Sequence, residues 1–254
     1  MEARLRHSTI LDLARAKGGV DVTSLVTDLG VAPETIRRDL RVLVDRGVLR
    51  RVHGGAVAVE STGFETPAAL RSTSQVEQKR RIAVAAASLL QGAESVYVDE
   101  GFTPQLVAEQ LAQTSAELTV VTPSLTTAQA LAGLSRITVL VLGGRMRGRT
   151  LATVDHWALR MLSELSIDLA FLGANGISRE LGLTTPDPAV AAVKQEAVTR
   201  SRRRVLVGVH TKFGTSSFCR FATVRELEAI VTGHELSPRE AARYEALGPR
   251  LIRA

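Results

Sequence analysis

Residues 30–57 constrain this chain most, because an arginine-rich helix pattern is followed there by a short basic hairpin pattern. At about 100° per residue, Ile36, Leu40 and Leu43 fall on one narrow face of the helix. The polar residues of a different face are Thr35, Arg37, Arg38 and Arg41. Pro33 suits the first helical turn, where its fixed backbone angle and missing N–H do no harm. A helix that buries aliphatic groups and presents guanidinium groups is suited to an anionic partner.

A two-stranded hairpin is predicted directly after this helix. Residues 48–52 read as a short strand and residues 56–57 as its partner, joined by a tight turn at residues 53–55. The basic residues of this hairpin are Arg50, Arg51 and His53. They are placed to contact phosphate groups beside the helix.

Two further helices are expected upstream. Residues 10–14 carry a helical apolar stripe, and Asp21 is placed to cap a second helix that Gly30 would end. Three helices and a hairpin make a winged helix-turn-helix over residues 1–57. In that fold the third helix enters the major groove of DNA and the hairpin follows the phosphates.

The alternative is that these arginines form only a solvated helix face. Residues 35–51 hold six arginines against Asp39 and Asp45, whereas a solvated helix usually mixes opposite charges four residues apart. We therefore interpret residues 1–57 as a DNA-binding domain.

The composition of the whole chain narrows the class of protein. The 254 residues carry a formal net charge of +6, and no stretch reaches the length of a membrane span. The lone Cys219 excludes an internal disulfide and fits a reducing cytoplasm. The five histidines show no ligand spacing, so neither a metal ion nor a cofactor is expected. We expect a cytoplasmic protein that associates with the nucleoid when it binds DNA.

The rest of the chain alternates between helix and strand patterns. Residues 58–73 read as a linker, and residues 74–254 as an effector-binding and oligomerisation domain. Strands are expected at residues 95–99, 118–122, 137–142, 169–173 and 205–209, and helices at residues 74–90, 105–113, 125–132, 156–163 and 189–199. Short apolar strands between helices predict an α/β fold with a mainly parallel sheet covered on both faces.

Polar and glycine residues gather in the loops that follow the predicted strands. In a parallel sheet these loops meet at the carboxyl edge, where ligands bind near helix N-termini. Glycine lets a backbone N–H approach a ligand closely, and Lys or Arg supplies charge for an anion. The loops are residues 99–103, 122–124, 143–147, 173–176 and 210–212. Their convergence predicts a site for a small anionic ligand.

Other basic and aromatic residues receive structural interpretations. Residues 200–204 are expected to form a solvated helix end, and Trp157 is expected to be a packing residue. Arg145, Arg147 and Arg149 share one loop, where they either bind the ligand or keep the loop soluble.

Several motifs are typical of one protein family. The most specific are Thr-Ile-Arg-Arg-Asp-Leu at residues 35–40 and His-Gly-Gly-Ala at residues 53–56; Phe-Leu-Gly-Ala-Asn-Gly follows at residues 171–176. On these motifs the chain resembles the DeoR family of bacterial repressors, from residue 6 to about residue 231. Ala32 departs from the family, which usually has a serine capping the recognition helix. The missing cap weakens the helix start by about 1 kcal/mol.

The resemblance implies a larger domain similar to ribose-5-phosphate isomerase, controlled by a phosphorylated sugar or a related anionic metabolite. It implies that Asp99, Gly101 and Thr103 form the sugar-phosphate loop. Lys194 and Lys212 would be cationic partners of the ligand, with residues 175–176 (Asn175 and Gly176) as another wall. The neighbouring loops add the remaining candidates, which are Glu100, Phe102, Gly143, Gly144 and Arg147.

Glu100 and Phe102 depart from the family pattern, which has small or hydroxyl residues there. A carboxylate about 4 Å from a phosphate would repel it by about 4 kcal/mol at an effective dielectric constant near 20. Glu100 is therefore expected to point to solvent or to pair with Arg147 or Lys212.

The sequence thus predicts a DNA-binding transcriptional regulator rather than an enzyme. The resemblance implies a repressor of a sugar or carbon metabolism operon, bound as a homo-oligomer (dimer or tetramer) to repeated half-sites in double-stranded DNA. One alternative is a regulator whose effector pocket is altered or lost, with Phe102 filling the site. Another is a sugar-phosphate isomerase, but Asp168 precedes its predicted strand and would lie at the edge opposite the glycine loops.

Overall fold

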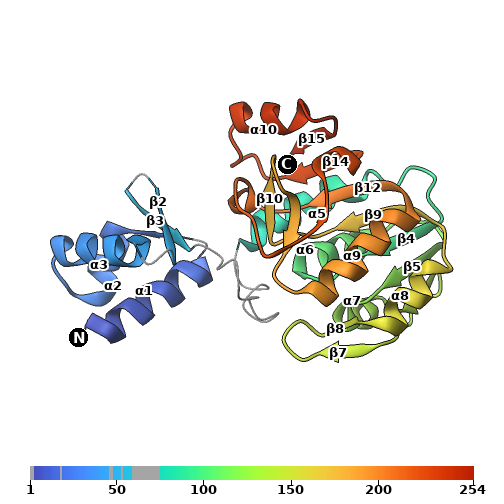
Figure 1. Ribbon diagram of the computed structural model, residues 1–254, viewed down its shortest axis with the longest axis horizontal. Helices are drawn as coiled ribbons and strands as arrows, with labels where there is room; N and C mark the ends of the chain where they lie inside the picture. Colours follow the sequence, from blue (N-terminus) through green and yellow to red (C-terminus); the bar gives the residue numbers. More distant parts are fainter. Residues whose placement is uncertain (1–2, 18, 46–47, 53, 59–74) are drawn as a thin grey trace. The chain divides into compact units, whose positions relative to one another are not determined.

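The computed structural model describes residues 3–17, 19–45, 48–52, 54–58 and 75–254 (Figure 1). The chain divides into two compact units, Met1–Gln75 and Val76–Ala254. Most of the segment that the sequence suggests as a linker, residues 59–73, lies outside the described residues.

The first unit is the predicted arrangement of three helices and a wing. Its helices are α1 (Ala3–Lys17), α2 (Val22–Leu29) and α3 (Pro33–Asp45), and its strands are β1 (Val20–Asp21), β2 (Leu49–Val52) and β3 (Gly55–Ala58). The strands form an antiparallel sheet in the order β1-β3-β2, so a short third strand joins the predicted hairpin. As predicted, Asp21 caps α2 by accepting a hydrogen bond from the Ser24 N–H at 2.8 Å, and Gly30 ends it with a left-handed φ of 63°.

An apolar cluster and one buried ionic cluster hold this unit together. Ile36, Leu40 and Leu43 of α3 are buried, which confirms the predicted inward face. On the same inward side, Asp39 accepts hydrogen bonds from Arg6 Nε at 2.5 Å and bonds His7 Nε2 at 2.8 Å. These contacts join α3 to α1.

The second unit is built on a seven-stranded sheet. Its strands are β4 (Ser95–Val98), β5 (Leu118–Thr122), β6 (Ile137–Val141), β9 (Ile167–Leu172), β12 (Ser201–Val207), β14 (Ala229–Thr232) and β15 (Arg250–Arg253). Neighbours pair parallel in the order β15-β14-β12-β9-β4-β5-β6. The predicted parallel sheet is therefore confirmed, and β14 and β15 extend it beyond the expected strands.

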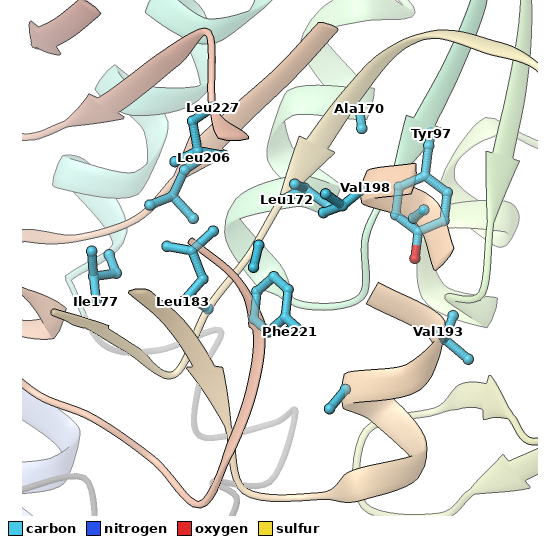
Figure 2. Packing of buried hydrophobic residues seen from close by; sticks show 14 of the residues in the cluster. Tyr97, Ala170, Leu172, Ile177, Leu183, Val193, Val198, Leu206, Phe221 and Leu227 are labelled. Atoms are coloured by element: carbon cyan, nitrogen blue, oxygen red, sulfur yellow. The ribbon is translucent and has the colours of Figure 1, made fainter. Parts of the chain in front are cut away.

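Helices cover both faces of this sheet, because its strands are apolar on both sides. The helices are α5 (Val76–Ala87), α6 (Phe102–Leu111), α7 (Leu125–Leu131), α8 (His156–Ser163), α9 (Pro188–Arg200) and α10 (Pro238–Glu245). Buried residues of α5, α6 and α7 share one core cluster, and those of α8, α9 and α10 share the other. Figure 2 shows part of the second cluster, to which α9 contributes Val193 and Val198 and the sheet contributes Leu172 and Leu206.

The structure also contains two short antiparallel elements that the sequence did not predict. They are the hairpin of β7 (Arg145–Arg147) and β8 (Ala152–Val154), and a small sheet of β10 (Gly176–Ser178), β11 (Gly182–Thr185) and β13 (Cys219–Ala222). The interpretation of residues 200–204 as a solvated helix end is wrong beyond Arg200, because β12 begins at Ser201. Arg203 pairs with Glu228 at 2.8 Å, and Arg204 donates to the carbonyl of Val198 at 2.9 Å.

The path of the chain through the sheet singles out one position. From β4 the chain moves outward through β5 to β6 and then returns to β9 on the other side of β4. The carboxyl ends of β4 and β9 therefore flank a topological switch point, where open α/β sheets bind ligands.

None of the helices in the described part of the chain is long and apolar enough to cross a membrane. The same residues contain no cluster of three His, Cys, Asp or Glu side chains that could hold a metal ion.

The Asp39 cluster gives a testable pH dependence. Burial of Asp39 opposes ionisation, but hydrogen bonds from Arg6 and His7 outweigh it and hold the pKa of this carboxyl below its usual range. Its stabilising effect is therefore present above the ordinary aspartate pKa of about 4 and is lost as the pH falls through the lower folded value. Asp39→Asn should lower the free energy of unfolding of the first unit by about 3 kcal/mol near neutral pH, because it leaves the buried guanidinium group of Arg6 without its counter-charge.

Hydrogen exchange of the α1 and α3 amides in denaturant measures this difference. It should shrink as the pH is lowered from neutral to about 2. The exposed Asp45→Asn on the same helix is the matched control and should change stability by less than about 0.5 kcal/mol. Equal losses in the two variants would contradict the role given to Asp39.

Candidate DNA-binding surface and effector site

The outward face of α3 presents the arginines that the sequence singles out. Arg37, Arg38 and Arg41 are exposed, and Thr35 is half-buried. Arg37 pairs with the exposed Glu34 one turn earlier. Within the described residues, Arg38 and Arg41 form no ion pair. The helix therefore offers two uncompensated guanidinium groups to a partner.

The start of α3 has no side-chain cap, as expected from Ala32. The carbonyl oxygen of Ala32 accepts hydrogen bonds from the N–H groups of Thr35 at 3.0 Å and Ile36 at 3.3 Å. Pro33 occupies the first helical position, so one N–H that would need a cap is absent.

The wing contributes basic residues from β2. Arg51 is exposed, and Arg50 lies opposite Val57 in the β2–β3 register. His53, the third predicted wing residue, lies outside the described residues.

In the second unit, Asp99 lies at the switch point, directly after β4, and is fully buried. Its Oδ2 accepts a hydrogen bond from the Gly173 N–H at 2.8 Å, and its Oδ1 accepts one from the Glu100 N–H at 2.9 Å. Since Gly173 follows β9, the carboxylate ties together the ends of the two strands that flank the switch point.

Lys194 of α9 supplies the counter-charge for Asp99. Its Nζ donates to Asp99 Oδ2 and to the Gly173 carbonyl at 3.2 Å, and its side chain is 2% exposed. The Phe221 ring lies 5.5 Å from the same ammonium group. Burial and the adjacent Glu100 carboxylate raise the pKa of Asp99, and the Lys194 charge opposes them. The predicted Asp99 and Lys194 are thus brought into one ion pair.

Glu100 belongs to this charged cluster. It is buried, so the expectation that it points to solvent is wrong. Its Oε1 lies 3.9 Å from the Nζ of Lys194, a cation that the sequence did not suggest as its partner. Two buried carboxylates therefore share one buried ammonium group.

Phe102 and Thr103 begin α6, after Gly101, whose φ of 117° is disfavoured for other residues. Thr103 is buried, and Phe102 is half-buried against the α5–α6 core. The ammonium group of Lys79 lies 5.6 Å from the centre of the Phe102 ring. Phe102 therefore packs toward α5.

The first turn of α5 contacts a second loop at this edge of the sheet. The side chain of Gln78 bonds His210 Nδ1 at 3.0 Å, and His210 follows β12. Gln78 and Lys79 are both buried, although they are polar. Neither was placed among the site residues, because their helix precedes the sheet and follows no strand.

The remaining candidates lie on both sides of the ion pair. Lys212 Nζ donates to the Ala174 carbonyl at 2.5 Å, directly after Gly173. Asn175 Oδ1 accepts a hydrogen bond from Thr185 Oγ1 at 3.1 Å. A Cβ at Gly176 would lie 2.7 Å from Ser216 Cα, so this position requires glycine for packing.

The glycines after β6 also have packing roles. The N–H of Gly143 points to Met161 Sδ at 3.1 Å, and a Cβ on Gly144 would lie 2.3 Å from the Val154 carbonyl oxygen. Arg147 Nη2 pairs with Asp187, the N-cap of α9, at 2.9 Å. Gly143 and Gly144 thus pack against α8 and β8, and Arg147 contacts the helix that carries Lys194.

Asp168 lies at the opposite edge, as the sequence indicated. It accepts hydrogen bonds from the Ser95 hydroxyl at 2.8 Å and the Ser95 N–H at 3.0 Å, at the start of β4. The Ser95 hydroxyl is the main cause that lowers the pKa of Asp168. This carboxylate joins β4 and β9 at their amino ends, at the edge of the sheet opposite the Asp99 cluster.

Comparison with known proteins places both units in one family. Residues 6–62 match the DeoR-like helix-turn-helix domain, and residues 74–234 match the DeoR C terminal sensor domain. The chain is 35% identical over 250 residues to the HTH-type transcriptional regulator GlpR of Haloferax volcanii, covering 97% of this chain and 96% of that protein. It is 32% identical over 232 residues to the glycerol-3-phosphate regulon repressor of Escherichia coli K12, covering 91% of each.

The solved structure of ribose 5-phosphate isomerase A from Methanocaldococcus jannaschii aligns with 54% of this chain and 54% of its own, with a TM-score of 0.40 and 14% identity. The two domain matches and the full-length relatives show that the chain belongs to the DeoR family of DNA-binding transcriptional regulators.

Proposed function

We propose that this regulator represses an operon of sugar or carbon metabolism and is controlled by a small anionic metabolite such as a sugar phosphate. The observation that carries the DNA-binding half is the outward face of α3, where Arg38 and Arg41 are exposed opposite a buried aliphatic face. The repressor role is supported by relatives such as the glycerol-3-phosphate regulon repressor of E. coli. We further propose that the protein works in the cytoplasm, on the nucleoid.

In this proposal α3 reads the major groove through Thr35, Arg37, Arg38 and Arg41. Arginine on guanine is the commonest specific contact in that groove. Arg50, Arg51 and His53 of the wing grip the phosphate backbone, which positions the protein without specifying sequence. One such domain contacts too few base pairs to select a single site in a genome. Two or more copies therefore read repeated half-sites.

Arg38→Ala tests the assignment of α3. Its exposed side chain makes no ion pair within the described part of the chain, so its removal should leave the fold intact. Specific operator binding should weaken by about 1–3 kcal/mol at fixed salt, because a base contact is lost. Fluorescence anisotropy on DNA from upstream of the gene measures this loss.

Arg80→Ala is the matched control, since Arg80 is an exposed arginine on α5 that pairs only with the neighbouring Glu77 among the described residues. It should leave DNA affinity unchanged. Full operator affinity in the Arg38 variant would refute the assignment of α3 as the reading helix.

The effector half of the proposal concerns the carboxyl edge of the second sheet. Lys194 meets two carboxylates there, so its charge is already matched before a ligand arrives. An anionic ligand would therefore be bound chiefly by backbone N–H groups at the start of α6 and by Lys212, since Arg147 already pairs with Asp187. Glu100 opposes that binding, which restricts the ligands that this chain accepts.

Replacing the two divergent residues tests this account. Glu100→Ser with Phe102→Thr removes a buried carboxylate and restores small hydroxyl groups beside Gly101. The affinity for sugar phosphates should rise, by up to the roughly 4 kcal/mol of repulsion expected for a carboxylate about 4 Å from a phosphate. Isothermal titration calorimetry with paired sugars and sugar phosphates measures the gain.

The single variant Phe102→Thr is the matched control, because it keeps the carboxylate. Equal affinities in the parent, the control and the double variant would contradict the proposed pocket. A parent protein that binds no sugar phosphate while the double variant does would favour the alternative of an altered pocket.

The isomerase alternative has little support from the geometry. Catalysis of that kind needs an acid and a base that both reach the substrate. Asp99 is engaged in an ion pair, and Asp168 lies at the other edge of the sheet. We therefore propose a regulator without catalytic activity.

A further inference from the structure

The two outer edges of the seven-stranded sheet differ in how they are protected. β15 carries Arg250 and Arg253 at its ends, with both side chains exposed. β6 reads Ile-Thr-Val-Leu-Val and has neither charge nor proline. Single folded chains usually guard a free edge with charges, proline or a bulge, because an unguarded edge pairs with other strands. The sequence of β6 is therefore typical of a strand whose outer edge pairs with another strand.

Apolar side chains continue from β6 onto α8. In the β5–β6 register Leu140 lies opposite Val121, which belongs to the core cluster beneath α8, so Leu140 is on the α8 face of the sheet. Trp157 and Met161 lie one turn apart on α8 and are 62% and 40% exposed. They also lie beside Gly143, since a Cβ there would be 3.5 Å from Met161 Sδ and 3.9 Å from Trp157 Cβ. The expectation that Trp157 is a packing residue within the chain is wrong.

We call Leu140, Trp157 and Met161 the β6–α8 surface. At about 200 Å² for a fully exposed large side chain, their uncovered area is on the order of 280 Å². That is about a third of the roughly 800 Å² that one partner contributes to a standard interface, before the strand backbone is counted. The rim carries both signs of charge, Arg160 and Glu164, at 3.8 Å from each other. A second copy would therefore meet no net repulsion at this rim.

We propose that the β6–α8 surface is a two-fold interface between two copies of this chain, in which the β6 strands pair antiparallel. Antiparallel pairing of identical strands is self-complementary, so one sequence supplies both sides. The pairing would satisfy the outer N–H and C=O groups of β6, which no strand in the described residues pairs with, and would join two sheets into one. The surface lies on β6 and α8, so the proposal does not depend on the identity of the effector.

Sedimentation velocity of the full chain over a dilution series tests the interface. Leu140→Glu places a charge on the paired edge and should at least halve the assembled mass at concentrations where the parent is associated. Leu181→Glu is the matched control, because Leu181 is 49% exposed in the turn between β10 and β11, away from β6. The control should keep the parent mass.

Trp157 is the only tryptophan of the chain, so its fluorescence reports the same surface. Its emission should be blue-shifted in the assembled parent, and red-shifted on dilution and in Leu140→Glu. Trp157→Glu, on the exposed side of α8, gives a second disruption that leaves the strand unchanged if Leu140→Glu fails to fold. A monomeric parent, an unchanged mass in a folded interface variant, or the emission of an exposed indole in the assembled protein would each overturn the proposal.

Discussion

The buried pairing of Asp99 with Lys194 is the interaction on which the second unit depends. A charged pair removed from water is costly, and it persists only where further hydrogen bonds satisfy its remaining atoms. Here two backbone N–H groups bind the carboxylate, and the Gly173 carbonyl binds the ammonium group. The pair therefore fixes the ends of β4 and β9 and the position of α9 at once.

Glu100 adds a second buried carboxylate beside the same ammonium group. Burial and the Glu100 carboxylate raise the pKa of Asp99, whereas the Lys194 charge lowers it. In the proposed function, the side chains that fix the ends of β4 and β9 are therefore also those that a ligand at this edge of the sheet would meet.

The elements with strong periodicity were predicted well from the sequence. The buried face of α3, the caps of α2 and the parallel strands from β4 to β12 follow from patterns only a few residues long. The convergence of Asp99 and Gly173 also follows, because parallel strands bring their carboxyl ends to one edge. Lys194 lies within α9, and only the resemblance to the DeoR family indicated it. The carboxyl-terminal strands β14 and β15 were missed, since their short apolar runs lie among charged residues.

The errors share one physical cause. The ion-pair and hydrogen-bond partners of a side chain, and its exposure, are set by tertiary contacts. Arg203 and Arg204 look like a solvated charge run, yet their guanidinium groups bind carbonyls and Glu228 beside β12. For Glu100 the sequence suggested solvent, Arg147 or Lys212, whereas Lys194, on a helix more than ninety positions further along the chain, lies 3.9 Å from it. Trp157 looks like a core residue by composition, while α8 turns it outward.

The inward orientation of Asp39 bears on how DNA affinity responds to ions in solution. Asp39, the acidic residue of the Arg-Arg-Asp motif, contacts Arg6 and His7 on the inner side of α3. Its charge therefore does not offset the charges of Arg38 and Arg41 on the outer side. Glu34, by contrast, partly neutralises Arg37. Each phosphate that a guanidinium group neutralises releases condensed counterions, with a slope of about −0.9 in log affinity against log salt. A carboxylate turned toward the protein interior thus helps to determine how steeply the complex with DNA weakens as salt is added.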